Sequence, residues 1–451
     1  MEALKFNDQE YEVKQVKFQD EELTYRAFEN IIYVANPIDD IQKLNIYVPE
    51  EYYHNIKINN YDIETAPIFV PNSVGGYMPG PATQPGQPIF NKEDSVFRAL
   101  QHGYVVVCIG IRGRKLENNV GVAPACIVDY KAGIRYLRHN KDNIPGDTEK
   151  IISNGTSAGG ALSSLLGVTG NHPDYEPYLK ELGAEDERDD IFAASCYCPI
   201  TNLDHADMAY EWEFEGLNDY LMSRYLPDHK IEKIPGTMNT NQIQMSKELK
   251  TLFKVYFNDL HLQYENHDMN LDDLKEYIKK IVIQSADRAL QEGNDLSSYD
   301  WIIIENKKVV DVDYNSYIQF RARMKPTPAF DNVEMGTPEN ELFGTLDTQY
   351  QHFTLYSTQH SLVNGKLADS HIIKMLNPMR YIDDQKAKTA RHFRIRHGAI
   401  DRDTSLAISA ILAIKLRNAG IEVDHFYPWN IAHSGDYDLD ELFMWIDKIC
   451  Q

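Results

Sequence analysis

The 451-residue sequence predicts an α/β protein, with a mostly parallel sheet flanked by helices and one large, mainly helical insertion. Strand-sized apolar runs alternate with helical patterns over the first 200 residues, as in proteins built from parallel strand–helix units. From about residue 201 to 389 the chain is polar, rich in Tyr, Asn, Asp and Lys, and poor in strand-like runs. The alternation then returns. We therefore expect a core formed by residues 1–200 and 390–451 and an inserted domain formed by residues 201–389.

The elements of the first core segment are predicted by apolar runs and their spacing. Residues 103–110 are a continuous run rich in Val and Ile, which is typical of a strand buried on both faces of a parallel sheet. Apolar residues three and four positions apart predict a helix over 127–137. The other strands expected here are 31–34, 42–49, 66–70 and 151–152.

The same patterns predict the elements of the insertion and of the second core segment. Amphipathic spacing indicates helices around 247–256 and 271–290 in the insertion. Beyond it, we expect a helix over 405–418 that stops before Gly420. The remaining expected elements are strands at 393–396 and 421–427 and a final helix at 439–449.

Acidic residues dominate the charge of the chain. The 68 Asp and Glu residues outnumber the 45 Lys and Arg residues, which gives a formal net charge of −23. Such a surface repels phosphate backbones and argues against nucleic acid as a partner. Hydrophobic residues make up 43% of the chain, an ordinary globular proportion. The longest apolar run, around 104–111, is strand-sized, so we expect no membrane association.

Two features favour a cytoplasmic location. The N-terminus lacks a basic segment followed by an apolar one, so no secretory signal is expected. The five cysteines are an odd number without zinc-type spacing, which favours reduced thiols. Cys196 and Cys198 would point to one face of a strand, and we expect neighbouring core thiols rather than a pair of metal ligands.

Three other clusters of chemically active residues have plain structural interpretations. The charge run 185–190 lacks the glycine and the spacing of a calcium loop, so we expect a solvated face. Residues 204–207 offer metal-ligand types without a known ligand spacing, so we expect no metal there. The aromatic stretch 210–214 is a candidate lining for a substrate channel, with core packing expected for at least half of it.

The segment 151–160 carries the strongest chemical signal. It places Ser157 at the centre of a Gly-x-Ser-x-Gly pattern, after an apolar strand and before the helix-like residues 161–166. A nucleophile on a tight strand-to-helix turn needs small neighbours, because strand and helix pass close to each other there. We therefore interpret Ser157 as a nucleophile and expect the N–H of Ala158 to face an oxyanion.

A serine nucleophile needs a base and an orienting acid. In proteins with this type of strand-to-helix turn, the serine comes first in the chain, the acid second and the histidine third. The loop after the strand at 393–396 offers Asp401 and Asp403, which spacing alone does not distinguish; one of them could cap the next helix. His433 follows the last expected strand and fits the position of the base. We expect structural roles for His397, which precedes the acid, and His425, which lies within a strand.

A glycine-rich loop, Val74-Gly75-Gly76-Tyr77, occupies the place from which a second oxyanion donor usually comes. Glycine at this position lets the backbone approach a substrate carbonyl closely. A turn that simply requires a positive φ explains the same residues, so the loop leaves both interpretations open.

The chain resembles the bacterial tannases (tannin acylhydrolases of the intracellular type found in lactobacilli), and the resemblance runs nearly end to end. The segments that carry it are 71–77, 110–114, 154–160, 205–212, 338–340, 396–398, 401–405 and 433–438. The resemblance implies an α/β-hydrolase core with a large lid and a Ser157–Asp401–His433 triad. It also implies that Asp401 rather than Asp403 is the triad acid and that Gly76 is the second oxyanion donor.

The resemblance further assigns Lys325, Glu339 and Asp403 to the hydroxyl groups of a galloyl ring. Carboxylates accept hydrogen bonds from such hydroxyls and an ammonium group donates one. A ring without hydroxyls would leave these charged groups unpaired, so the pocket can discriminate against such a ring by roughly 10⁴-fold. Sequence divergence in the lid around residues 225–249 leaves the size of the accepted substrate open.

The function expected from these residues is that of a serine esterase without a cofactor or metal, which acts on small galloyl or other aromatic esters. It would release gallic acid from simple gallates, tannins and depsides. The alternative within the same class is a feruloyl-type or general aromatic carboxylesterase that uses the same triad. An alternative from another class is a non-catalytic ligand-binding or adhesion protein built on a hydrolase scaffold.

Overall fold

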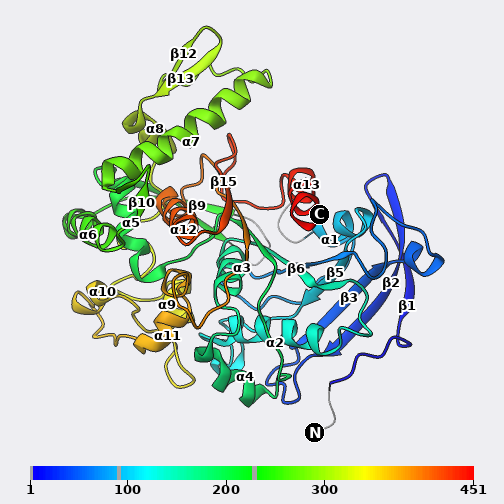
Figure 1. Ribbon diagram of the computed structural model, residues 1–451. Helices are drawn as coiled ribbons and strands as arrows, with labels where there is room; N and C mark the ends of the chain where they lie inside the picture. The colour runs from blue at the N-terminus through cyan, green and yellow to red at the C-terminus, as the bar shows by residue number, and fades with distance from the viewer. Residues whose placement is uncertain (1–3, 89–92, 226–230) are drawn as a thin grey trace.

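The computed structural model describes residues 4–88, 93–225 and 231–451, and its centre is a nine-stranded sheet (Figure 1). The strand order is β1-β2-β3-β5-β4-β6-β7-β14-β15. The pairs from β1 to β5 are antiparallel, and the pairs from β5 to β15 are parallel. The strands are β1 Glu12–Phe18, β2 Glu21–Ile32, β3 Lys43–Pro49, β4 Pro67–Pro71, β5 Val105–Ile109, β6 Asp147–Thr156, β7 Ala193–Tyr197, β14 His392–Arg396 and β15 Glu422–Phe426.

Helices cover both faces of this sheet because successive strand residues alternate between two apolar clusters. Ile68 belongs to the cluster that contains the helices α2, α3 and α12, whereas its neighbour Phe69 belongs to the cluster that contains α1 and α13. The helices of the core are α1 Ser95–Gln101, α2 Ala125–His139, α3 Ala158–Val168, α4 Glu176–Leu182, α12 Leu406–Asn418 and α13 Leu439–Cys450. The predicted α/β class with a mostly parallel sheet is confirmed.

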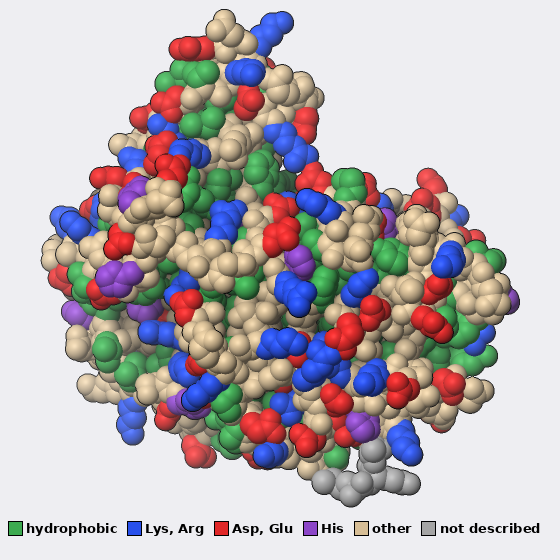
Figure 2. Space-filling model, in the orientation of Figure 1, with side chains coloured by type: hydrophobic (Ala, Val, Ile, Leu, Met, Phe, Trp, Pro, Cys, Tyr) green, Lys and Arg blue, Asp and Glu red, His purple; other side chains and the backbone are tan. Residues whose placement is uncertain are grey.

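Among the described residues between β7 and β14, none joins the nine-stranded sheet. Helices predominate there: α5 Leu203–Phe214, α6 Thr240–Asp259, α7 Leu271–Gln291, α8 Tyr314–Arg321, α9 Pro338–Leu342, α10 Leu355–Gln359 and α11 Ser370–Met375. Three hairpins were not predicted: β8 Asp219–Tyr225 with β9 Ile231–Thr237, β10 Gln263–Tyr264 with β11 His267–Asp268, and β12 Ile302–Glu305 with β13 Lys308–Val312. Helix α7 and the last hairpin form the projection at the top of Figures 1 and 2.

Short 3₁₀ helices complete the chain at η1 Glu50–His54, η2 Glu117–Asn119, η3 Pro173–Tyr175 and η4 Pro378–Arg380.

Figure 2 shows acidic and basic side chains interspersed over the face that it presents. Among the described residues, none of the helices combines the length and the apolar character needed to cross a bilayer. Of the divergent stretch 225–249, residues 226–230 lie outside the described residues.

The expectation of a solvated charge run at 185–190 is wrong for its last two residues. Asp189 and Asp190 are buried, and Asp189 accepts hydrogen bonds from Lys131 at 2.7 Å and Arg135 at 2.9 Å. Burial opposes ionisation of Asp189, but these two cations hold its pKa below the ordinary value. The physical reason is that α2 places both cations on its face toward this segment, so the acidic residues pair inside the protein instead of facing water.

The expectation for the two neighbouring cysteines is partly wrong. All five cysteines are free and buried. However, Cys196 lies in β7 and packs in the cluster with α2 and α3, whereas Cys198 packs in the opposite cluster with α1 and α13. The strand ends at Tyr197, and Cys198 has a φ of 35°, so the alternation on which the prediction relied stops one residue too early.

Candidate active site

Ser157 lies on the sharp turn between β6 and α3. Its φ of 61° and ψ of −121° are a combination that residues with a side chain rarely adopt. The turn is tight: a Cβ atom on Gly155 would lie 2.3 Å from the carbonyl oxygen of Gly159. The N–H of Ser157 donates to the carbonyl oxygen of Tyr197 at 3.0 Å, which fixes the turn against β7. The glycine spacing in the sequence is thus explained by close backbone contact.

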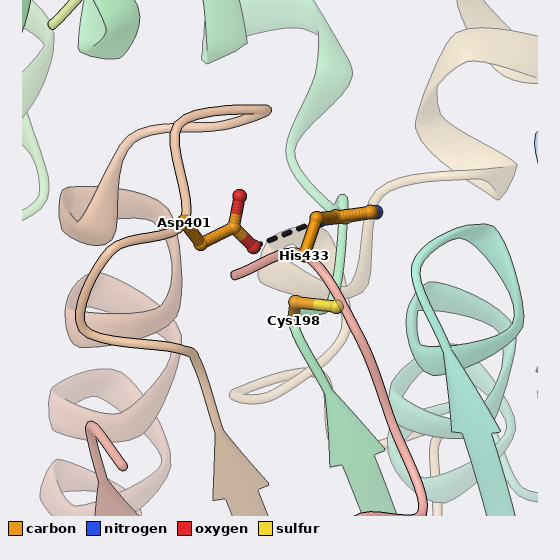
Figure 3. A group of neighbouring side chains, drawn as sticks. All are labelled: Cys198, Asp401 and His433. Atoms are coloured by element: carbon orange, nitrogen blue, oxygen red, sulfur yellow. Dashed lines mark hydrogen bonds and ion pairs between the residues drawn. The ribbon is translucent and has the colours of Figure 1, made fainter. Parts of the chain in front are cut away.

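The structure brings Ser157, His433 and Asp401 together from three separate loops. His433 Nε2 lies 2.8 Å from Ser157 Oγ. His433 Nδ1 lies 2.8 Å from Asp401 Oδ2, the contact drawn as a dashed line in Figure 3. Asp401 is fully buried, while a quarter of the His433 side chain is exposed. Burial disfavours both charges, but each residue stabilises the other, so the pKa of Asp401 is lowered and that of His433 is raised. This geometry allows a proton to pass from the hydroxyl to the imidazole.

The contacts of Asp403 distinguish it from Asp401. The backbone N–H of Asp403 donates to Asp401 Oδ1 at 2.8 Å, whereas the Asp403 carboxylate receives a hydrogen bond from Lys325 Nζ at 2.9 Å. Neither aspartate caps the following helix, because Ser405 is the N-cap of α12. The two carboxylates that spacing could not distinguish therefore face different partners.

A second histidine contacts the same carboxylate. His397 Nε2 lies 3.2 Å from Asp401 Oδ2, and His397 Nδ1 lies 2.9 Å from Ser409 Oγ. His397 is fully buried, and sequence reasoning gave it only a structural role, although its spacing of four residues from Asp401 was visible. His425, by contrast, pairs with the hydroxyl of Tyr277 at 2.9 Å, as expected for a structural residue.

The glycine-rich loop packs directly against the serine turn. A Cβ atom on Gly159 would lie 2.8 Å from the carbonyl oxygen of Val74. Gly76 and Tyr77 have φ values of 54° and 55°, and the N–H of Met78 closes the turn onto the carbonyl oxygen of Gly75 at 3.0 Å. The turn thus requires a positive φ and also lies beside the serine, so both interpretations of the loop fit the geometry.

Arg114 holds this loop from behind and was not identified from the sequence. Its Nε donates to the carbonyl oxygen of Gly76 at 2.6 Å, and its backbone N–H donates to that of Tyr77 at 2.8 Å. The guanidinium also pairs with Glu341 at 2.5 Å. The segment 110–114 was noted for its resemblance, but Arg114 and Glu341 are 227 residues apart, so no local pattern could reveal their contact.

Lys325, Asp403 and Glu339 form a charged group near the triad. Besides its bond to Asp403, the Lys325 ammonium lies 4.1 Å from the centre of the Phe330 ring. Glu339 lies in α9 and is 8% exposed. Burial raises the pKa of Glu339 while Lys325 opposes that shift, and burial of Asp403 is outweighed by Lys325 and His433, which lower its pKa. The three groups are therefore coupled electrostatically.

Tyr210 fixes the backbone on both sides of this charged group. Its hydroxyl accepts hydrogen bonds from the N–H groups of Met324 and Lys325, each at 3.0 Å, and donates to the carbonyl oxygen of Arg402 at 3.1 Å. Tyr210 and Phe214 are buried, which agrees with core packing for part of the aromatic stretch.

Two fully buried ion pairs lie beneath the same region. Arg321 pairs with Glu213, and its guanidinium also donates to the backbone carbonyl oxygen of Asp401, at 3.0 Å from Nε. Arg323 pairs with Glu211. Insertion residues thus contact the loop that carries Asp401, a relationship that sequence reasoning missed.

These features define a class of protein. A serine at a strand-to-helix turn, an imidazole against its hydroxyl and a buried carboxylate behind the imidazole, all at one end of a mostly parallel sheet, are the arrangement of an α/β-hydrolase.

Comparison with known proteins defines the family. A family model described as BD-FAE matches residues 64–224. A tannase from Lactobacillus plantarum is 43% identical, with 100% of both chains covered and a TM-score of 0.96. A tannase from Fusobacterium nucleatum is 46% identical, again with 100% of both chains covered, and has a TM-score of 0.94. The chain belongs to the tannase family and is a carboxylic ester hydrolase, which confirms the resemblance stated from its motifs.

Two further similarities are informative about chemistry. A tannin acyl hydrolase solved in complex with ethyl gallate is 43% identical over 99% of both chains, with a TM-score of 0.94. The esterase LipC from Mycobacterium tuberculosis is 34% identical over 124 residues. That alignment spans 27% of this chain and 28% of LipC.

Proposed function

We propose that the chain hydrolyses galloyl esters, with Ser157 as nucleophile, His433 as general base and Asp401 as the acid that orients the imidazole. The observation that carries this proposal is the continuous contact from Ser157 Oγ through both nitrogens of His433 to Asp401, each step 2.8 Å long. Asp401 accepts from Nδ1–H, so Nε2 has a free lone pair toward the serine hydroxyl.

The reaction proceeds through an acyl-enzyme. His433 takes the proton of Ser157 as Oγ attacks the ester carbonyl, and the same proton then passes to the leaving alcohol. The N–H groups of Ala158 and Gly76 stabilise the negative oxygen of the tetrahedral intermediate. A water molecule, deprotonated by His433, then attacks the galloyl-serine; the bond to Ser157 Oγ breaks, His433 returns the proton to Oγ, and gallic acid is released. The first nucleophile, the base and the oxyanion donors are thus all groups of the protein.

Recognition of the galloyl ring rests on Lys325, Asp403 and Glu339. Two carboxylates and one ammonium group match ring hydroxyls that both donate and accept hydrogen bonds. Related proteins have been solved in complex with ethyl gallate and with 3,4-dihydroxybenzoate, both of which carry adjacent ring hydroxyls. Residues 201–389 act as a lid that contributes Lys325 and Glu339 to the pocket, and esters and depsides of gallic acid are the substrates.

The proposed location is the cytoplasm. All five cysteines are free thiols, as expected in a reducing compartment. The net charge of −23 supports small-molecule substrates rather than nucleic acid as partners.

The decisive experiment is gallic acid release from methyl gallate by the wild type and by the Ser157→Ala variant. We expect a loss of roughly 10⁶-fold in kcat for Ser157→Ala, since the nucleophile is removed. Unchanged turnover in that variant would exclude the mechanism. Methyl ferulate and p-nitrophenyl acetate serve as comparison substrates. A feruloyl-type or general esterase would prefer these esters and would tolerate Lys325→Ala without losing galloyl turnover.

A further inference from the structure

A third side chain reaches the paired His433 and Asp401, although ester hydrolysis does not use it. The Cys198 sulfur, a carboxylate oxygen of Asp401 and a ring nitrogen of His433 all lie within 4.8 Å of one another. Figure 3 shows the thiol and the carboxylate beside the same imidazole, each carried by a loop that follows a strand of the sheet. Thiolate, imidazole and carboxylate are the donors that zinc and cadmium ions bind in proteins.

The backbone fixes the direction of this thiol. Cys198 follows β7 with a φ of 35°, and its N–H donates to the carbonyl oxygen of Arg396 at 2.6 Å, which ties the turn to β14. The sulfur lies 3.3 Å from the carbonyl oxygen of Ser434, the residue after His433. The backbone bond to β14 and the sulfur contact with Ser434 together place the thiol beside the loop of the base.

We propose that Cys198, His433 and Asp401 form an inhibitory binding site for a soft divalent cation, with Zn²⁺ and Cd²⁺ as the fitting ions. An ion can approach along the His433 ring, a quarter of which is exposed, whereas Cys198 and Asp401 are buried behind it. On binding, the thiol releases its proton to solvent. The dication is then neutralised by one thiolate and one carboxylate, which suits a buried site, and water completes four-fold coordination.

Occupation of this site would stop the base from working, whichever ring nitrogen binds the ion. An ion on Nδ1 moves the imidazole proton to Nε2, which then faces Ser157 Oγ as a donor. An ion on Nε2 takes the lone pair that must accept the serine proton. The inhibitory part of this inference rests on the proposed function, whereas the binding part does not.

The test combines a binding measurement with an activity measurement. Chelator-treated wild-type enzyme is titrated with CdCl₂ while the thiolate-to-cadmium absorption band and methyl gallate hydrolysis are followed. We expect about one Cd²⁺ per chain with a thiolate band, loss of activity, and recovery of activity with EDTA. The Ser157→Ala variant should bind Cd²⁺ with the same band, so binding is measured even if the substrate assignment fails.

Variants of two cysteines locate the ion. Cys198→Ser and Cys198→Ala should retain activity and lose the thiolate band. The Cd²⁺ concentration that halves their activity should rise by more than about 100-fold, which exceeds the roughly 10- to 100-fold cost of losing a contact outside the coordination sphere. Cys196→Ser is the matched control, since Cys196 is equally buried two residues earlier, and it should behave as the wild type. A folded Cys198 variant that keeps the band or the inhibition would overturn the proposal, as would a wild type that binds no Cd²⁺ through a thiolate.

Discussion

Arg114 donates a hydrogen bond from Nε to the carbonyl oxygen of Gly76 at 2.6 Å. The same guanidinium pairs with Glu341 in α9, the helix that also carries Glu339. One side chain therefore connects the proposed oxyanion donor with the helix that carries Glu339, which is proposed to bind the galloyl ring. In the proposed mechanism, Arg114 would therefore link the position of the reacting carbonyl to that of the ring.

Arg114→Lys should lower kcat by about 10- to 100-fold, because a lysine cannot donate to Gly76 and Glu341 with the same geometry. KM for methyl gallate should change less than kcat, and both are obtained from steady-state kinetics. Arg98→Lys is the control, since Arg98 forms a similar pair with Asp440 at the surface. Equal kcat values for wild type and Arg114→Lys would show that the loop holds its conformation without the guanidinium.

Asp401→Asn and Asp403→Asn should have different consequences. Asp401→Asn should reduce kcat about 10⁴-fold on every ester, because the amide no longer favours the required imidazole tautomer. Asp403→Asn should mainly raise KM for methyl gallate and spare p-nitrophenyl acetate. Kinetics of both variants on both substrates checks this, and the reverse pattern would make Asp403 the orienting acid.

The pH dependence of the Asp403→Asn variant has a definite sign. Burial alone lowers the pKa of His433, whereas the charges of Asp401 and Asp403 raise it above the ordinary value. The base must be neutral, so activity rises as pH passes the pKa of His433. Removing the charge of Asp403 should move the acidic limb of kcat/KM to lower pH.

That limb should be measured with p-nitrophenyl acetate, so that ring binding does not interfere. Asp311→Asn, at the ion pair of hairpin β12–β13 with Lys279, is expected to leave the limb in place. A shift of the limb to higher pH in Asp403→Asn would contradict the electrostatic assignment.

Asp189→Asn should lower the free energy of unfolding by about 3–5 kcal/mol, because it leaves the buried Lys131 ammonium without its counter-charge. Urea denaturation at neutral pH measures this change. Lys180→Gln is the control, because Lys180 is exposed and pairs only weakly with Glu176 at 3.7 Å. It should change the free energy of unfolding by less than about 1 kcal/mol. A similar small effect for Asp189→Asn would mean that the buried pair contributes little.

The sequence was informative wherever a signal is local. The glycines around Ser157 are required by contacts within the same turn, so their spacing identified the turn. Strand β5 was visible because both of its faces are buried. Strand β1 was missed because none of its side chains is buried. Hairpin β12–β13 was missed although it carries the apolar runs 302–304 and 309–310, because runs of two or three apolar residues are too short to distinguish a strand from a helix.

Contacts between distant segments could not be predicted in this way. Arg321 and Asp401 are 80 residues apart, and neither neighbourhood indicates the other. The choice between Asp401 and Asp403 depended on the family resemblance, because their local settings are alike. Cys198 was misplaced because one residue with positive φ ends the two-residue alternation of β7.

The contact of Arg321 with the backbone of Asp401 has a consequence for protein engineering. Arg321 comes from α8 and its counter-charge Glu213 from α5, while Glu213 also accepts a hydrogen bond from the N–H of Leu406 at the start of α12. A truncated or chimeric enzyme that exchanges only one of these helices would leave Arg321 or Glu213 buried without its counter-charge. The loop that carries Asp401 would then lose its support. Replacing the segment between β7 and β14 with that of a related enzyme would therefore require Arg321 and Glu213 to be transferred together.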